Sequence, residues 1–156
     1  MHQLIELAQE YASLITAVGV LVATWQLWLS RSLAQSSFED SLVKEYRDLI
    51  RRIPVDVLIG RSFDREVAGR AYSELRELIF NYLDLTNEQV YLRMNRCVRR
   101  STWREWSDGI RSNLSRPVFA LIWNEVKQES PDMFSELQEL EKRSFKGDPR
   151  WWRGLP

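Results

Sequence analysis

Hydrophobic and polar positions divide the chain into a long uncharged N-terminal stretch and a longer amphipathic remainder. Residues 11–29 read YASLITAVGVLVATWQLWL and carry no formally charged side chain. A helix needs about 20 such residues to cross a bilayer core of ~30 Å, so the stretch predicts a transmembrane helix. The alternative is a buried core helix of a soluble protein, because residues such as Thr16 and Gln26 lower its hydrophobicity.

Small and polar residues recur along one face of this predicted helix at alternating spacings of four and three, which is a heptad pattern. We call this set the seam, and it consists of Ala12, Thr16, Gly19, Ala23, Gln26 and Ser30. In lipid, small and hydroxylated residues mark the faces where helices meet, and a glutamine is less costly in a helix interface or a wet lumen than against lipid. We therefore expect self-association through the seam, and a ring of copies could line a pore. The alternative is that small residues are simply common in membrane helices.

The flanks of the uncharged stretch predict its orientation. No lysine or arginine precedes it, whereas Arg31, Lys44 and Arg47 follow it. The positive-inside rule then places the N-terminus outside and the C-terminal domain in the cytoplasm. Trp25 and Trp28 fall near one end of the stretch, where interfacial aromatic residues are expected.

Apolar residues at helical spacing continue behind the stretch, and no segment alternates as a strand, so the sequence predicts an all-α fold. No proline or glycine interrupts residues 30–53, and Pro54 is expected to end a long stalk helix. A small helical bundle should follow. The predicted parts are a short extracytoplasmic N-terminus (1–10), the transmembrane helix (11–29), a juxtamembrane stalk helix (30–54), a cytoplasmic helical domain (55–145) and a C-terminal tail (146–156).

Local signals predict where the helices of the domain begin. An apolar face runs through residues 67–85, and Pro117 and Pro131 each suit a first helical turn. Capping-box patterns occur at Thr86 with Gln89 and at Thr102 with Glu105. The tryptophan pair at 151–152 is expected to be an interfacial anchor, a plug for a partner or part of a disordered tail.

Composition restricts the chemistry that the chain can perform. The sequence has one histidine, His2, and one cysteine, Cys97, and its formal net charge is zero. These counts argue against histidine-based acid–base chemistry and against a cysteine-rich metal site. We therefore expect no catalytic residues, no metal, no cofactor and no small-molecule substrate, and predict that the protein is not an enzyme.

One segment is strongly basic against this neutral background. The residues proposed to bind an anionic partner are Arg93, Arg96, Arg99, Arg100, Arg104, Arg111, Trp103 and Trp106, within the segment 93–116. Arginine can pair bidentately with phosphate, and tryptophan can stack on bases or lie among lipid headgroups. RNA or a nucleotide, anionic lipid and an acidic protein surface are all suitable partners. The alternative is a solvated helix face with tryptophans in the core.

The layout resembles, loosely, a group of uncharacterised short bacterial proteins with one N-terminal membrane helix, a run like WQLWLSR and a helical domain with a pattern like Trp103-Arg-Glu-Trp106. It is also similar to the small membrane accessory proteins of some RNA-targeting CRISPR systems, which are thought to form ring-shaped pores. Those proteins carry a degenerate helical RNase domain, whose active members need an arginine and a histidine a few residues apart. Arg96 and Arg111 are the only counterparts here and neither is followed by histidine, so the resemblance implies an architecture without RNase activity.

Three hypotheses of different classes follow from these patterns and from the resemblance. The first is an effector anchored in the bacterial inner membrane that self-assembles through its N-terminal helix, as a homo-oligomeric pore that alters membrane permeability in antiphage defence. The second is a membrane-tethered adaptor that recruits a protein, RNA or anionic lipid through the basic segment. The third is a soluble helical enzyme or RNase, which the scarcity of catalytic residue types disfavours.

Overall fold

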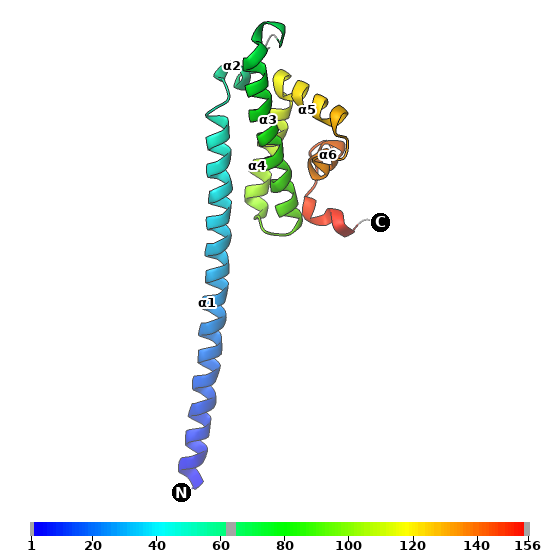
Figure 1. Ribbon diagram of the computed structural model, residues 1–156. Coiled ribbons are helices and arrows are strands. Elements are labelled where there is room, and N and C mark those ends of the chain that lie inside the picture. Colours follow the sequence, from blue (N-terminus) through cyan, green and yellow to red (C-terminus); the bar gives the residue numbers. More distant parts are fainter. Residues whose placement is uncertain (1, 62–64, 155–156) are drawn as a thin grey trace. The chain divides into compact units, whose positions relative to one another are not determined.

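The computed structural model describes the backbone of residues 2–61 and 65–154, and the side chains of residues 15–61 and 69–152. Every regular element in these ranges is helical and none is a strand, which confirms the predicted all-α class. The elements are α1 (His2–Ile50), α2 (Val55–Leu58), α3 (Arg65–Met94), α4 (Arg100–Leu114), α5 (Pro117–Glu129), α6 (Ser135–Lys142) and the short 3₁₀ helix η1 (Pro149–Gly154) (Figure 1).

The chain forms two compact units, Met1–Phe38 and Glu39–Pro156. Every described residue of the first unit belongs to α1. The second, which we call the helical domain, begins earlier than the predicted boundary at residue 55, because the last turns of α1 already contribute to its core. Leu42 is buried, and Tyr46 and Ile50 pack against the hydrophobic core cluster of the domain. A helix without proline or glycine shows no local break at the position where such packing begins.

The long predicted helix ends near the expected proline. The last residue of α1 is Ile50, the chain turns through Ile53, and Pro54 caps α2 with a ψ of 138°. Ile53 and Val57 are buried, so this corner is part of the core. Residues 62–64, which follow this corner, lie outside the described part of the chain.

The core of the domain surrounds α3. Its side chains Ile79, Tyr82 and Leu83 are fully buried, and the Tyr82 ring meets Phe119 of α5 edge to face at 5.2 Å between centroids. The remaining elements α4, α5, α6 and η1 lie around α3 or beside one another (Figure 1). Burying a large apolar side chain contributes roughly 1.5–3 kcal/mol, so this cluster is the main source of the domain's stability.

The predicted helix start at Thr86 and Gln89 is wrong. The helix α3 runs through this position, after a kink at Gly69 (φ +40°). Thr86 is buried, and its hydroxyl donates a hydrogen bond to the carbonyl of Leu83 at 2.9 Å within the helix. Thr86 and Gln89 have the residue types and the spacing of a capping box. The apolar face of α3 nevertheless continues across them, so the helix does not end there.

The start of α4 is capped by a residue from far along the chain. Its N-cap residue Arg99 provides no side-chain cap. Instead, the buried carboxylate of Glu39 accepts hydrogen bonds from the Arg99 backbone N–H at 2.6 Å and from the Thr102 hydroxyl at 2.9 Å. The predicted capping box of Thr102 with Glu105 is therefore wrong, because Thr102 lies inside the first turn and donates to Glu39.

The last elements differ from the prediction in where α6 begins and in the folding of the predicted tail. The helix α5 begins at Pro117 as expected, whereas α6 begins at Ser135, after a turn in which Phe134 adopts a left-handed conformation (φ +58°). The predicted tail belongs to the fold through residue 152. Trp152 packs against the core cluster and lies 5.2 Å from the guanidinium of Arg143.

Candidate functional site

The described part of the uncharged helix leaves its apolar side chains uncovered. Its large hydrophobic residues from Ile15 to Leu29 are between 44% and 72% exposed, whereas the core of the domain holds residues close to 0%. Trp25 and Trp28 lie together with 5.7 Å between ring centroids, and both are largely exposed.

Within the described residues, no helix is both long enough and apolar enough to cross a membrane. The side chains of the first four residues of the predicted span, 11–14, are not among those described.

The seam residues lie along one exposed stripe of α1. Thr16, Gly19, Ala23, Gln26 and Ser30 are all exposed, and the side chain of Ala12 lies outside the described residues. A Cβ added to Gly19 would meet no heavy atom within 4 Å. A shallow groove on the same face of the helix is lined by Gln26, Ser30, Leu33 and Ser37.

The basic segment divides into structural and exposed residues. Arg93 is buried, and its guanidinium donates two hydrogen bonds to the Asp148 carboxylate and one to the Val98 carbonyl at 2.7 Å. Trp103 is 3% exposed and belongs to the core. These two residues serve the fold and are not available to a partner, which corrects the prediction for them. A sequence pattern counts charges and cannot show that Asp148 pairs with one of them.

The environment of Asp148 shows the strength of this pairing. Burial alone would raise its pKa, but hydrogen bonds from Arg93 and from the Arg150 backbone, with the charges of Arg93 and Arg100, hold the pKa of Asp148 below its ordinary value. The carboxylate therefore stays ionised and anchors η1 to the end of α3.

The other arginines of the segment remain at the surface. Arg111 forms an exposed ion pair with Asp108 at 3.4 Å. Arg96, Arg100 and Arg104 are exposed, and within the described part of the chain their side chains form no ion pair or hydrogen bond. Arg99 is half-buried and has partners. The surface that could meet an anionic partner is thus narrower than predicted.

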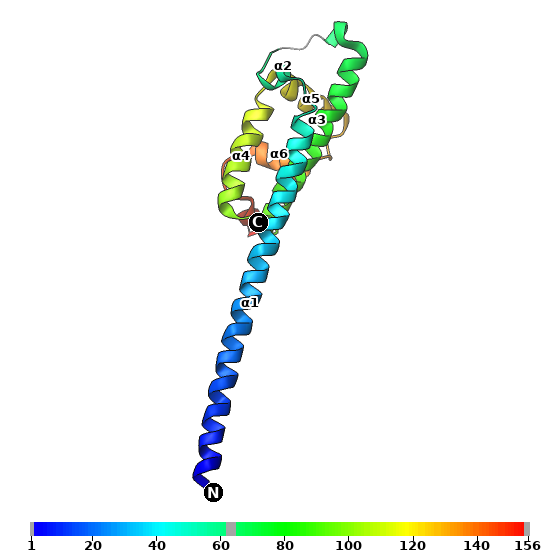
Figure 2. The same cartoon turned by 90° about the vertical axis from the view of Figure 1, so that its left-hand side faces the viewer.

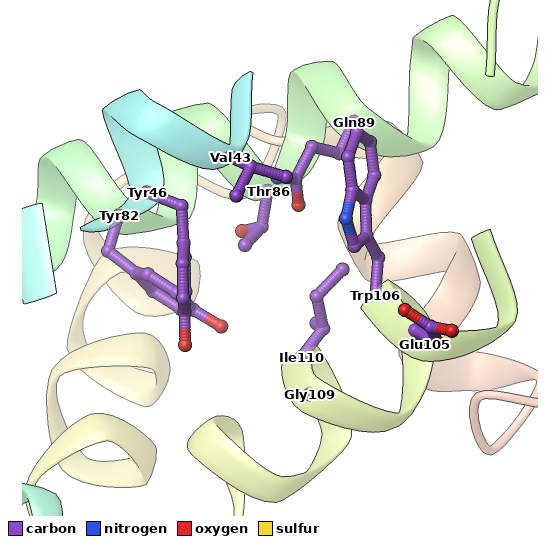
Figure 3. A pocket seen from close by; sticks show the side chains of 9 residues that line it. All are labelled: Val43, Tyr46, Tyr82, Thr86, Gln89, Glu105, Trp106, Gly109 and Ile110. Carbon is purple, nitrogen blue, oxygen red and sulfur yellow. The ribbon is translucent and has the colours of Figure 1, made fainter. Parts of the chain in front are cut away.

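A small cavity opens between the last turns of α1, α3 and α4, and we call it the Gln89 pocket. Figure 2 shows these turns of α1 beside α3 and α4, and Figure 3 shows the lining side chains. Its volume is about 140 Å³ and its wall is mostly apolar. Tyr46, Tyr82 and the half-buried Trp106 supply aromatic surface, and Gln89 supplies an amide. Trp106 was expected to bind an anionic partner, and here its indole forms a wall of the pocket.

Two tyrosines close one end of the pocket. The Asn113 amide donates hydrogen bonds to the hydroxyls of Tyr82 at 3.0 Å and of Tyr46 at 3.4 Å. Burial raises the pKa of Tyr82 well above its ordinary value, an effect that the hydrogen bond from Asn113 only partly opposes. The Tyr82 hydroxyl therefore stays neutral.

Gln89 is a site residue that sequence reasoning did not find. Its residue type was taken as half of a capping box, whereas the side chain is 4% exposed and points toward the cavity (Figure 3). The only signal for this role in the sequence is a glutamine at a position on the apolar face of a predicted helix.

Comparisons of the chain with protein-family models, with curated proteins and with solved structures found no match in any of the three.

Proposed function

We propose that the protein is a bacterial inner-membrane effector that anchors through residues 11–29 and assembles with copies of itself through the seam. The observation that carries the proposal is the exposed apolar surface of α1 between Ile15 and Leu29. Apolar surface left in water costs about 25 cal/mol per Å². A helix with this many exposed large apolar side chains is therefore expected to bury them against lipid or protein. Lipid is the cover that this arrangement fits best, because no charged side chain interrupts residues 11–29.

The two faces of α1 have different chemistry, which supports assembly within the membrane. The stripe of small and polar residues around Gly19 and Ala23 lets two helix backbones approach closely. Leu21, Trp25 and Trp28 occupy the opposite face at 3.6 residues per turn, and they suit contact with lipid. In a ring of copies the seam, with Gln26, would surround a polar lumen. The effector activity that we propose is therefore a change in membrane permeability, in the setting of antiphage defence that the layout suggests.

Assembly is tested by the mass of the full-length protein in mild detergent, measured by light scattering with the detergent subtracted. Ala23→Leu places a bulky side chain on the seam. Ala17→Leu makes the same change away from the seam on the same helix, at a residue that is also exposed. We expect a defined multiple of 18.5 kDa for the native chain and for Ala17→Leu, and a loss of assembly for Ala23→Leu. A monomeric native chain, or equal masses for the two variants, contradicts the proposal.

The pore is tested separately by ion flux from liposomes that contain the protein. Flux should be present for the native chain and for Ala17→Leu, and absent for Ala23→Leu. Assembly without flux removes the pore and leaves an assembling anchor. Flux that persists when assembly is lost contradicts a lumen formed by the seam.

Orientation is tested through Cys97, the only cysteine in the sequence and an exposed one. A membrane-impermeant maleimide should label Cys97 only after the inner membrane of the host bacterium is opened. A cysteine introduced at Gln3 in a Cys97→Ser background should be labelled in spheroplasts with an intact inner membrane. The reverse pattern contradicts the proposed orientation.

A second candidate function is a membrane-tethered adaptor, and the exposed arginines Arg96, Arg100 and Arg104 favour it. A cytoplasmic domain held below a negatively charged leaflet would bring these side chains near anionic headgroups. Full-length protein carrying Arg100→Gln and Arg104→Gln should bind anionic vesicles or RNA less tightly at low salt than protein carrying Lys142→Gln and Lys146→Gln. Equal binding by the two double variants contradicts the adaptor, and the choice between vesicles and RNA identifies the partner.

A further inference from the structure

The Gln89 pocket contains a polar group without a partner. The Gln89 side chain is 4% exposed, and its amide forms no hydrogen bond within the described part of the chain. The amide atoms of Gln89 are not sealed in the core, because the fully buried side-chain polar atoms without a partner among the described residues are Trp123 Nε1 and Arg150 Nε. A polar group at the wall of a cavity that no protein atom satisfies bonds to whatever occupies the cavity. Because the amide points into the cavity (Figure 3), a molecule in the cavity is the natural source of the missing bond.

The size and wall of the pocket restrict that molecule. The cavity of about 140 Å³ is close to the ~150 Å³ of an apolar cavity in another protein that holds benzene. The indole of Trp106 and the rings of Tyr46 and Tyr82 line it, and flat aromatic faces pack well against a flat ligand. One aromatic ring with one small substituent therefore matches both the volume and the wall.

Charge restricts the ligand further. The carboxylate of Glu105 is the one formally charged group among the residues that line the pocket, and Glu105 is exposed at the edge. An anionic ligand would meet this carboxylate and would also lose its hydration in a mostly apolar space. A neutral ligand avoids both costs.

We infer that the Gln89 pocket is a binding site for a neutral, one-ring aromatic molecule whose hydrogen-bonding substituent pairs with the Gln89 amide. This inference goes beyond the proposed function and does not depend on it, because the pocket lies within the helical domain and its walls contain no residue of the seam. The ring packs between Trp106 and the tyrosines, and the substituent faces Gln89. Water is the other occupant that the pocket could hold.

The test is calorimetric titration of the full-length protein in mild detergent with phenol, and with benzene as the matched ligand without a hydroxyl. One hydrogen bond to a buried amide should make phenol bind about 10-fold tighter than benzene, a difference of ~1.4 kcal/mol. Benzoate should bind more weakly than phenol. Equal binding of phenol and benzene, or tighter binding of benzoate, contradicts the inferred ligand class.

Two variants assign the binding to the pocket. Gln89→Leu removes an unpaired buried amide and should abolish the preference for phenol while benzene still binds. Gly109 lies in the pocket wall, and a Cβ there would meet no heavy atom within 4 Å, so Gly109→Leu fills the space without a clash at Cβ. Gly109→Leu should abolish saturable binding of both phenol and benzene. The heat that remains with this variant measures the uptake of ligand by the detergent. If the native chain and Gly109→Leu give the same titration, the pocket holds water and the inference is wrong. Gly109→Ala, which leaves most of the space, should still bind phenol.

Discussion

Three hydrogen bonds hold the Arg93 guanidinium, which donates two to the Asp148 carboxylate and one to the Val98 carbonyl. Removing one partner of a buried ion pair leaves the other charge uncompensated, which typically costs about 3–5 kcal/mol. Asp148 retains some contact with solvent, so we expect Asp148→Ala to lower the free energy of unfolding by about 3 kcal/mol. Denaturant unfolding of the full-length protein measures this loss.

The matched control is Asp108→Ala. Asp108 pairs with Arg111 at the surface, where ion pairs contribute about 0–1 kcal/mol. Similar losses for the two variants would contradict the structural role of Arg93 and would return it to the group of arginines available to a partner.

The same pair predicts a dependence of stability on pH. The pKa of Asp148 is lower in the folded protein than in the unfolded chain, so the unfolded chain binds the proton more tightly. The stabilisation is therefore fully present above the unfolded pKa of about 3.9 and is lost as pH falls through the lower folded value. Urea unfolding at a series of pH values should show a loss below pH ~4 in the native chain that is smaller in Asp148→Asn. Equal pH dependence of the two proteins contradicts this origin.

At the scale of elements, the N-terminus of α4 depends on a carboxylate from α1. Glu39 satisfies the Arg99 backbone N–H and the Thr102 hydroxyl, and its negative charge lies at the positive end of the α4 dipole. We expect Glu39→Ala to lower the free energy of unfolding by about 2 kcal/mol, because it removes a buried cap. Glu105→Ala is the control, since Glu105 was the capping partner expected from sequence. It is exposed, and its removal should change the stability by less than about 0.5 kcal/mol. The opposite ranking of the two variants would favour the local capping box.

Helix starts were predictable from sequence only where the signal is steric. Pro117 lacks the N–H that a first turn leaves unpaired, and α5 begins there. The capping boxes at Thr86 and Thr102 failed, because a Ser/Thr hydroxyl and a Glu or Gln at the right spacing also occur inside helices. The cap of α4 comes from Glu39, distant in sequence, and no local pattern contains that information.

The candidate sites were predictable to the same limited extent. The seam follows from spacing alone, because every residue of a single helix is placed by its position in the sequence. The Gln89 pocket combines residues of three helices, and its geometry depends on packing that the sequence does not state. The basic segment is intermediate. Its charges were visible, but the burial of Arg93 and Trp103 was not, because it requires the position of Asp148 and of the core.

At the scale of the whole molecule, the boundary of the helical domain decides which fragment can fold alone. The compact unit begins at Glu39, and the last turns of α1 supply the buried Leu42 and part of the wall formed by Tyr46. A fragment of residues 39–156 should therefore unfold cooperatively, as followed by near-ultraviolet circular dichroism during heating. A fragment of residues 55–156, which starts at the predicted boundary, should lack a cooperative transition.

Magnitudes explain this difference between the fragments. Each large buried apolar side chain contributes roughly 1.5–3 kcal/mol, and residues 39–54 provide Leu42 and Ile53 besides the half-buried Tyr46 and the Glu39 cap. Together these approach the ~5–15 kcal/mol that a whole domain has in reserve. Leu42→Ala in the longer fragment is the intermediate case and should cost about 2–4 kcal/mol while the transition stays cooperative. Equal midpoints for the two fragments would show that α1 contributes no packing to the domain, and the Gln89 pocket would then lose the wall that Val43 and Tyr46 supply.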